Sequence, residues 1–488
     1  MFLLDLKDVR RLFSHFKGTF LGVGMTAYSR ITPGYFLDGY HIVSLRKTRD
    51  LSWLRRKVKV FSLEEAEGRF LGEEDLNSVS LLSHPFTKRY LQDLPHPKYF
   101  LLYQNYPGLE GLAGHEDWIL MANSASLRMQ VGDRAFFHNM VKELQINRIP
   151  GQIVPFETLF SQDYVYWSKK VSSEFVIHLL EIQKGGGRGT FFIHSMKDYR
   201  HLQQRLKGGI WRGSKLTRIS IHPFLEGVSA SLALCLTKHG ILYSGLQRQL
   251  IDLPYCEDIW ERGVFCGHAW GETQWPSQIL EEARRQGGLI GNYLARMGYR
   301  GIVGIDFLIT KDLKKIYPLE CNPRYTGAFP MLSQLHLGQG IIPMDVFHML
   351  EFLGVPYEID IDLLNSRYEK DLLRGSHLIL FALTRGGPLD GTPLNAGLYQ
   401  WDSEKDGISY IGGASDYTDF QNDNQFIIID GPPDTGGERA VFQDPLYRLC
   451  RVLFPYPILH KGEGLSLQIH SLVKWAYDML LNPRSHKQ

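Results

Sequence analysis

Three patterns in the sequence predict a protein of several domains, with α/β and α+β parts. Short β-type segments alternate with helical segments over roughly residues 17–123, strand-like segments follow one another through roughly 175–251, and mixed strand and helix signals continue toward the C-terminus. Alternation indicates a parallel sheet, and consecutive strands indicate an antiparallel meander. Because 488 residues suit about two to four globular units, we expect domains at 1–131, 132–354 and 355–488.

The composition excludes several classes of protein. The formal net charge is +2, so no broad basic field indicates nucleic acid as the main partner. No apolar stretch approaches the length of a membrane span, and the N-terminal apolar run is too short for a signal peptide. The five cysteines have no metal-ligand spacing and indicate free thiols in a reducing compartment. We therefore expect a cytoplasmic protein without nucleic-acid or membrane partners.

The N-terminal third begins with an amphipathic segment, MFLLDLKDVRRLF, that is typical of a helix. Five strand-like segments follow: TFLGVGM, HIVSL, VKVFSL, KYFLLYQ and DWILMAN. With helical or polar segments between them, they predict a small open parallel sheet that forms one side of a substrate cleft. Gly18, Gly22 and Gly24 lack the G-x-G-x-x-G spacing of a dinucleotide site, so a tight turn explains them better.

A second helix is expected after Gly132 and Asp133, with Asp133 as its N-cap and the Pro150-Gly151 pair beyond its end. Arg134 lies in its first turn and can reach a phosphate. An exposed helix arginine fits this spacing equally well.

A glycine-rich loop joins two predicted strands at about 175–183 and 190–194. Glycine at this density allows close approach of the backbone to a ligand, and its N–H groups can cradle phosphate oxygens. The alternative is a flexible hairpin tip. The loop residues are Lys184, Gly185, Gly186, Gly187, Arg188 and Gly189.

Three further strand segments, RISIHPF, SASLALCLT and ILYSGLQRQLI, predict an antiparallel meander. The connector from His222 to Gly227 has exposed backbone between apolar strands, which suits the edge of an adenine. Gln247 and Arg248 face opposite sides of the last strand, so at most one can reach a site. A helix, a break and a second helix are expected over 275–301.

The segment GIVGIDFLITKDLKKIYPLECNPRYTGAFP, at 301–330, predicts a two-stranded hairpin. Asp306 lies on its first strand, and Glu320 and Asn322 share one face at the end of the second. Such oxygen ligands suit Mg²⁺ held between protein and phosphates, and Arg324 suits a transferring phosphoryl group. A surface hairpin with scattered charges is the alternative, which the apolar strands and turn-rich loop disfavour.

In the order of these parts, the sequence resembles the ATP-grasp superfamily of carboxylate–amine ligases over roughly 132–330. The resemblance rests on GDR before a helix, the strand–GGGRG–strand hairpin, FLEG before a strand, and DF followed by E-x-N-P-R. It implies an ATP-grasp fold with an N-terminal Rossmann-like pre-ATP-grasp domain and a C-terminal α+β region. It also implies ATP and Mg²⁺, with two ions and with Mn²⁺ as an alternative metal.

The resemblance implies roles for individual residues. Asp306, Glu320 and Asn322 match metal ligands, and Arg324 and Arg248 are the catalytic candidates. The nucleotide-binding candidates are Arg134, His178, the loop from Lys184 to Gly189, His222, Phe224, Leu225 and Ser229. The family often has a basic residue on the strand before the loop; here His178 or Lys184 takes that place. Ser229 stands where a ribose-binding Glu is common.

Beyond about Gly354 the resemblance ends. The segments SHLILFAL, GLYQW, ISYIGG and QFIIID predict strands, and LQIHSLVKWAYDMLL predicts a closing helix. This region is the size of a domain. Capping the site, accepting the amine and forming a homodimer are all roles open to it.

The function expected is an ATP-dependent ligase that phosphorylates a carboxylate and couples it to an amine, both small molecules. One alternative keeps the fold but changes the acceptor, as in a kinase or a carboxylase. The other is a non-catalytic nucleotide-binding protein. The sequence names neither the carboxylate nor the amine.

Overall fold

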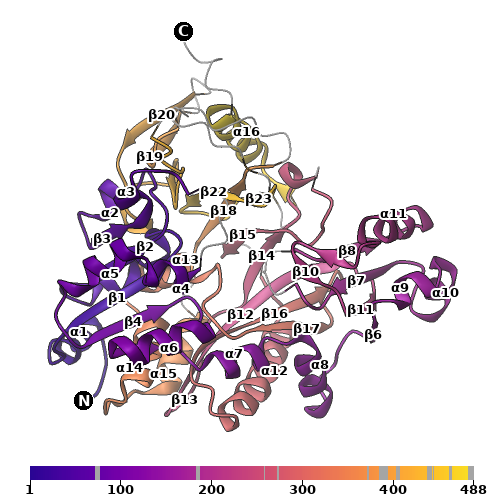
Figure 1. Ribbon diagram of the computed structural model, residues 1–488, viewed down its shortest axis with the longest axis horizontal. Coiled ribbons are helices and arrows are strands. Elements are labelled where there is room, and N and C mark those ends of the chain that lie inside the picture. Colours follow the sequence, from indigo (N-terminus) through magenta and orange to yellow (C-terminus); the bar gives the residue numbers. More distant parts are fainter. Residues whose placement is uncertain are drawn as a thin grey trace.

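The computed structural model describes residues 1–71, 77–182, 187–257, 259–271, 274–370, 373–383, 394–402, 407–436, 442, 444–460 and 464–481 (Figure 1). The N-terminal elements, in indigo and purple, lie to one side of the view, and a small magenta lobe projects on the other. The C-terminal strands, in yellow, lie between and above them. None of the helices in the described ranges combines the length and apolar character needed to span a bilayer.

The N-terminal part is a five-stranded sheet in the order β3-β2-β1-β4-β5, and all its pairs are parallel. The strands are β1 Thr19–Gly24, β2 His41–Ser44, β3 Lys59–Ser62, β4 Lys98–Leu102 and β5 Trp118–Met121. All five strands expected from the sequence are present, and the predicted parallel sheet is confirmed. Buried apolar runs in β1, β2 and β4 suit strands that are covered on both faces.

Short helices connect these strands. They are α1 Leu6–Phe13, α2 Leu51–Leu54, α3 Leu63–Glu67, α4 Ser78–Ser83, α5 Pro85–Gln92, α6 Pro107–Glu116 and α7 Ala125–Val131, with 3₁₀ turns η1 Tyr28–Arg30 and η2 Thr32–Tyr35. Helix α1 is the amphipathic helix expected at the N-terminus. Asp5 caps it by accepting hydrogen bonds from the N–H groups of Lys7 and Asp8.

The small lobe is a four-stranded antiparallel sheet in the order β6-β11-β7-β8. Its strands are β6 Gln152–Pro155, β7 Phe175–Leu179, β8 Thr190–Ile193 and β11 Arg218–Pro223. Helix α8 Arg134–Glu143 precedes the sheet, and the elements between its strands are α9 Thr158–Ser161, α10 Tyr164–Lys170, α11 Met196–Leu206 and the hairpin of β9 Ile210–Trp211 and β10 Ser214–Lys215. The glycine-rich loop joins β7 to β8, as expected. Buried aromatic and aliphatic side chains, among them Trp167 and Phe175, give this lobe its own core.

The largest sheet has eleven strands, in the order β17-β16-β12-β14-β15-β18-β22-β21-β19-β20, with β13 paired to β12. The strands are β12 Gly227–Thr237, β13 Gly240–Tyr243, β14 Gln247–Ile251, β15 Phe265–Trp270, β16 Gly301–Thr310, β17 Ile316–Asn322, β18 Gly375–Phe381, β19 Gly397–Asp402, β20 Gly407–Gly412, β21 Gln425–Ile429 and β22 Arg448–Phe454. The remaining elements are α12 Ser277–Arg296, α13 Phe329–Gly338, α14 Met344–Leu353, α15 Ile361–Lys370, α16 Leu467–Leu481, η3 Pro254–Cys256, η4 Tyr417–Asp419 and the short pair β23 Leu459–His460, β24 Gly464–Leu465.

The C-terminal strands continue the sheet that carries the predicted metal residues. Strand β15 pairs with β18 over four residues, from Gly267 opposite Leu378 to Trp270 opposite Gly375. Strands β18 to β21 are the four expected from the sequence, whereas β22 was missed although its residues are almost all buried. Strands from before and after the predicted boundary at residue 354 therefore belong to the same sheet.

Helix α12 corrects one expectation from the sequence. Its 20 residues form a single helix, not two helices with a break at Gly287-Gly288. A Cβ atom on Gly287 would lie 2.8 Å from a methyl carbon of Leu232, and one on Gly291 would lie 2.7 Å from a methyl carbon of Ile241. The glycines let the helix approach the sheet closely, so tertiary packing outweighs their low helix propensity.

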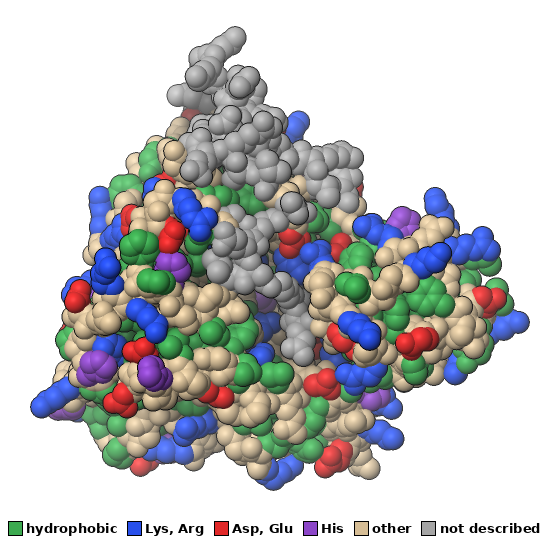
Figure 2. All heavy atoms as spheres, in the orientation of Figure 1, with side chains coloured by type: hydrophobic (Ala, Val, Ile, Leu, Met, Phe, Trp, Pro, Cys, Tyr) green, Lys and Arg blue, Asp and Glu red, His purple; other side chains and the backbone are tan. Residues whose placement is uncertain are grey.

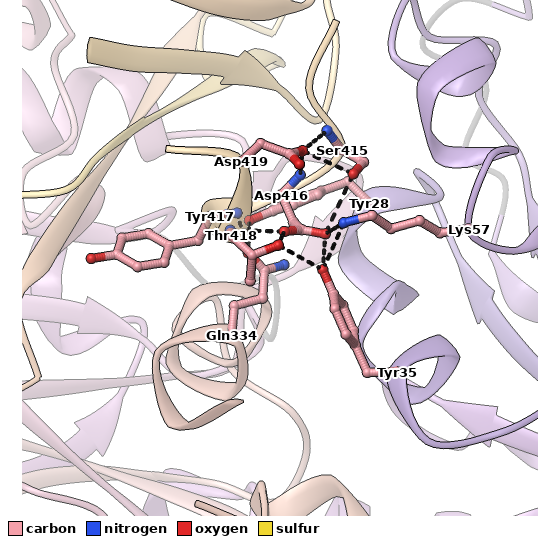
Figure 3. Close-up of polar contacts among 9 residues, drawn as sticks. All are labelled: Tyr28, Tyr35, Lys57, Gln334, Ser415, Asp416, Tyr417, Thr418 and Asp419. Carbon is pink, nitrogen blue, oxygen red and sulfur yellow. Dashed lines mark hydrogen bonds and ion pairs between the residues drawn. The ribbon is translucent and has the colours of Figure 1, made fainter. Parts of the chain in front are cut away.

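A polar cluster joins the N-terminal part to the C-terminal strands (Figure 3). The buried carboxylate of Asp416 accepts hydrogen bonds from Tyr35 and Thr418 and forms an ion pair with Lys57. Gln334, on α13, accepts through Oε1 from the backbone N–H of Tyr417 at 2.9 Å. One apolar core spans the same junction, because N-terminal strands, α13, α14 and β22 all contribute to it. These contacts fix two walls of the site relative to each other.

Candidate active site

The hairpin of β16 and β17 places two carboxylates side by side. The strands pair antiparallel, with Asp306 directly opposite Glu320. The register then shifts, because Phe307 pairs with Pro318 and Leu319 forms a bulge. Opposite residues of an antiparallel pair point to the same face of a sheet. The hairpin predicted from the sequence therefore brings both acids to one face.

Amide side chains connect this pair. Asn322 donates from Nδ2 to Asp306 Oδ2 at 2.9 Å and to Glu320 Oε1 at 3.4 Å. Gln249, on β14, donates from Nε2 to Asp306 Oδ1 at 2.8 Å. The Oδ1 atom of Asn322 accepts from Arg324 Nη2 at 3.0 Å. In this orientation Nδ2, and not Oδ1, faces the carboxylates, so Asn322 would bind a metal through Oδ1 only after its side-chain amide flips.

Two arginines flank the carboxylates. Asp133 caps α8 by accepting from the N–H of Phe136, which places Arg134 in the first turn. From there Arg134 Nη2 donates to Glu320 Oε2 at 2.8 Å. Arg324 Nη1 donates to the hydroxyl of Tyr103, on the N-terminal part. Arg134 thus lines the same cavity as the carboxylates and is not an isolated surface arginine.

The pKa values of the two carboxylates are shifted in opposite directions. Burial and the charge of Glu320 raise the pKa of Asp306 well above its usual range. Burial acts to raise the pKa of Glu320 as well, but Arg134, Asp306 and Arg324 outweigh it, so that pKa is lowered. Two close carboxylates cannot both ionise cheaply, and the opposite pKa shifts mean that Asp306 holds a proton more readily than Glu320.

The donor set fits a hard cation. Two carboxylates and an amide oxygen are ligands that Mg²⁺ accepts when phosphate oxygens and water complete its shell. The charge of Glu320 helps to raise the pKa of Asp306, and a cation bound between the two carboxylates would relieve this repulsion. Within the described residues, no group of three or more His, Cys, Asp and Glu side chains forms a metal cage.

A cavity of about 1150 Å³ opens over this cluster. Its walls come from all three parts of the chain, and Figure 2 shows a hollow at the centre of the face, beside the small lobe, with Lys and Arg side chains in it. The predicted site residues that line it are Arg134, His178, Gly187, Arg188, His222, Phe224, Leu225, Ser229, Asp306, Glu320, Asn322 and Arg324. Lys184, Gly185 and Gly186 lie outside the described residues.

The end of the glycine-rich loop is tied to the C-terminal part. Arg188 donates from Nη2 to Asp444 Oδ2 at 3.2 Å and to the carbonyl oxygen of Leu446 at 2.8 Å. Arg212 donates to Asp444 Oδ1 at 3.1 Å from another hairpin. Gly189 does not line the cavity; its carbonyl oxygen accepts from Leu179 N–H within the hairpin.

Two histidines of the small lobe, His178 and His222, have lowered pKa values. Burial, with repulsion from Arg134 and His222, lowers the pKa of His178 well below its usual value. Burial also lowers the pKa of His222 to about 4. His178 Nδ1 lies 3.0 Å from the hydroxyl oxygen of Thr190. His178 can therefore hydrogen-bond a ligand but supplies no positive charge near pH 7.

The predicted hinge lies along the cavity wall. Phe224 N–H donates to the carbonyl oxygen of Glu174 at 3.0 Å, so this donor is already used. Leu225 and Ser229 also face the cavity, and Ser229 pairs with Leu308 of β16. An adenine ring placed here would draw its backbone contacts from Leu225 and its neighbours.

Arg248 requires a correction. Ser231 pairs with both Asp306 and Gln247, so Gln247 and Gln249 share the face of the carboxylates. Arg248 points to the opposite face and does not line the cavity. Its predicted catalytic role has no support in the geometry. Gln249 reaches Asp306 instead, at a position that strand alternation could have indicated.

A row of buried polar groups, which sequence reasoning missed, crosses the sheet from the carboxylates to the N-terminal part. Ser231 Oγ lies 3.3 Å from His268 Nε2, and His268 Nδ1 lies 3.2 Å from His377 Nε2. Arg451 Nη1 donates to His377 Nδ1 at 3.1 Å, and Arg451 Nε to Asp430 Oδ2 at 3.3 Å. Four of these residues come from four different strands, Asp430 follows β21, and the five share no common motif.

The row has a direction. Arginine can only donate, so His377 accepts at Nδ1. Burial lowers the pKa of His268 to about 3 and that of His377 well below its usual value, so both rings are neutral. His377 then donates from Nε2 to His268, which donates from Nε2 to Ser231. The hydroxyl hydrogen of Ser231 remains available to a ligand in the cavity.

Comparison with known proteins supports this architecture. Residues 185–328 match the family model of the ATP-grasp domain. The sequence matches none of the curated proteins. The biotin carboxylase domain of Hydrogenobacter thermophilus 2-oxoglutarate carboxylase, solved with MgADP, ADP and bicarbonate, is similar at a TM-score of 0.57 and 12% identity, over 91% of this chain and 87% of that one.

Two ribonucleotide synthetases are also similar. Carboxyaminoimidazole ribonucleotide synthase from Aspergillus clavatus, in complex with ATP, has a TM-score of 0.52 and 12% identity, over 94% of this chain and 98% of that one. An ADP complex of N5-carboxyaminoimidazole ribonucleotide synthetase has a TM-score of 0.52 and 11% identity, over 95% and 96%. At these identities the likeness shows the fold. The fold is the ATP-grasp fold, and the chain carries an ATP-grasp domain, which confirms the resemblance noted in the sequence.

Proposed function

We propose that this protein is an ATP- and Mg²⁺-dependent ligase that activates a carboxylate as an acyl phosphate and joins it to an amine. The observation that carries the proposal is the Asp306–Glu320 pair with Asn322, flanked by Arg134 and Arg324 on the cavity wall. Support comes from the similar structures, whose complexes contain ATP, ADP or MgADP.

The residues have separate tasks in this proposal. Asp306, Glu320 and Asn322 would hold Mg²⁺, or Mn²⁺, which neutralises phosphate charge when bound. Arg134 and Arg324 can each donate to a phosphate oxygen, and Gly187 lets the loop backbone approach the phosphates. The hinge at Leu225 would hold the adenine.

The chemistry requires positioning more than a protein nucleophile. A carboxylate oxygen of the substrate attacks the γ-phosphorus, and the bond to the ADP oxygen breaks. The amine then attacks the acyl carbon, phosphate leaves, and the amine proton passes to a base or to water. Cationic groups such as Arg324 stabilise the charge that builds on the transferring group.

A carboxylase is the second candidate, because one similar structure holds bicarbonate and belongs to a carboxylase. Bicarbonate is itself a carboxylate that can be phosphorylated, so the same residues would serve. The two readings differ in the source of the carbon atom that joins the amine.

The test is release of ADP from MgATP over a screen of amino acids, small carboxylic acids and bicarbonate, with and without an amine. We expect release to require both substrates and to fall by more than about 100-fold in Glu320→Ala, since charge stabilisation in a transition state has this magnitude. Glu369→Ala is a matched control, because Glu369 pairs with Arg284 outside the cavity. Substrate-stimulated turnover that survives Glu320→Ala would count against the proposal, and labelled bicarbonate identifies a carboxylase.

A further inference from the structure

The end of the cavity between the N-terminal part and the C-terminal strands is strongly cationic. The N-terminal part supplies Arg30 and Arg46 there, and the C-terminal part supplies Arg448 and Arg451. Two acids, Asp430 and Asp444, also line the cavity. None of these residues belongs to the predicted nucleotide or metal set.

Most of the charges in this region are already matched. Arg46 Nη1 contacts Glu64 Oε1 at 2.6 Å, and Arg451 Nε contacts Asp430 Oδ2 at 3.3 Å. Arg188 is paired with Asp444. The charge of each of these three arginines is therefore neutralised by a carboxylate of the protein.

Two guanidinium groups have no carboxylate partner within the described part of the chain. Arg30 donates from Nε to the carbonyl oxygen of Val23 at 3.0 Å and from Nη1 to that of Ser29, and it packs against the rings of Tyr103 and Tyr325. Arg448 makes neither a hydrogen bond nor an ion pair there. A guanidinium group in a protein cleft normally binds an anion or an acceptor.

The backbone aims Arg448 into the cavity. Regular alternation would send Arg448 and Arg451 to opposite faces of β22. The register with β18 shifts between them, since Cys450 pairs with Leu380 and Arg448 with Phe381. A bulge of this kind commonly re-aims a side chain beside a binding site. Both arginines therefore line the same cavity.

The residue that follows β21, Asp430, binds Arg451 and not Arg448. Asp430 has a φ of 61°, a left-handed conformation that non-glycine residues rarely adopt. Its backbone N–H donates to Asp50 Oδ2 at 2.8 Å, and its carboxylate accepts from Thr26 and from Arg451. Arg451 is thus fixed by several partners, whereas the charge of Arg448 faces the cavity.

We propose that the small molecule entering this end of the cavity carries an anionic oxoacid group, a carboxylate or a phosphate, in addition to the groups that react, and that Arg448 binds it with help from Arg30. The substrate class is then a dicarboxylate or a phosphorylated compound. This inference rests on the proposed function for the reaction itself, but the binding it describes is measurable without turnover.

The test compares succinate with butyrate, which share a four-carbon chain and differ in one carboxylate. Thermal unfolding of the full-length protein is followed at millimolar ligand, with MgADP present and ionic strength held constant, and dissociation constants are taken from the shift. Inorganic phosphate forms a third arm that separates the two oxoacids. We expect succinate or phosphate to bind at least about 10-fold more tightly than butyrate, as a hydrogen bond to a charged group implies.

Arg448→Met should remove this preference, and Arg448→Lys should retain part of it. Arg374→Met is the control, because Arg374 pairs with Asp423 on the surface, outside the cavity. The inference would be overturned if butyrate, succinate and phosphate bound equally well, or if none of the three bound. A preference for succinate or phosphate that survives in Arg448→Met would also overturn it. If the screen finds no substrate that stimulates ADP release, but the protein still prefers succinate or phosphate to butyrate, the proposed function alone is overturned.

Discussion

Asp306 and Glu320 face each other across β16 and β17, and burial together with the charge of Glu320 raises the pKa of Asp306. The same geometry that suits a bound metal therefore makes the metal-free site unfavourable. Activity and stability should respond in opposite directions to loss of one carboxylate.

The first prediction concerns Asp306→Asn. The change removes a buried acid that is held protonated next to an anion, so we expect the free energy of unfolding without metal to stay equal or rise by about 1 kcal/mol. Stabilisation by MgADP should disappear. Urea unfolding in EDTA and in MgADP measures both effects. A large loss of stability in EDTA would show that the carboxylate has a structural role.

The second prediction is a pH effect at Asp50. Burial raises the pKa of this carboxyl from 3.8 to about 7. A pKa raised in the folded state gives stabilisation that is complete below the unfolded value, near pH 4, and is lost as pH rises through about 7. This single group should lower the unfolding free energy between pH 5 and pH 8 by about 2–3 kcal/mol relative to a non-ionising residue.

Asp50→Asn supplies that non-ionising residue, because its amide oxygen can still accept from Asp430 N–H. Its unfolding free energy should therefore decline less than that of the wild type over this pH range. Parallel pH profiles for the two proteins would contradict the raised pKa.

The third prediction concerns the tie between the glycine-rich loop and the C-terminal part. Arg188 and Arg212 both contact Asp444, and although burial opposes it, their charges lower the pKa of that carboxyl. In Asp444→Asn, we expect amide exchange in residues 187–190 to accelerate by about 10-fold, since a partly buried ion pair is worth on the order of 1 kcal/mol. Asp423→Asn, at the exposed pair with Arg374, should leave this exchange unchanged.

The fourth prediction concerns the buried imidazoles. His268 and His377 should both remain neutral from pH 5 to pH 9, each with its hydrogen on Nε2, because Arg451 donates at one end of the row. Nitrogen chemical shifts of the two rings measure the tautomers. Titration of either ring in this range, or an Nδ1–H tautomer, would contradict the assigned direction.

The sequence predicts the chain's local elements well where the signal is periodic. Five N-terminal strands, the β7–β8 and β16–β17 hairpins and α16 follow from alternation, glycine and turn residues. The glycines of α12 were misread as a break, because only the close approach to Leu232 explains them. Propensity is a local property, and here a tertiary contact outweighs it.

The candidate site divides in the same way. Asp306, Glu320 and Asn322 lie on one hairpin, so their spacing alone indicated a common face. Arg448 and Arg451 lie on β22 and His268 lies on β15, two strands far apart in the chain, and no spacing relates them to each other or to the hairpin. Their meeting depends on the order of strands in the sheet, which local patterns do not determine.

The ladder between β15 and β18 has a consequence for how such a protein can change its substrate. The strand that carries Arg448 and Arg451 belongs to the same sheet as the strands that carry the carboxylates. A recombined chain that takes its C-terminal part from a relative must rebuild this ladder and cover the strand edge it would otherwise expose. Diversification by point substitutions on β22 avoids that obstacle, so we expect new specificities to arise there more readily than by exchange of whole segments.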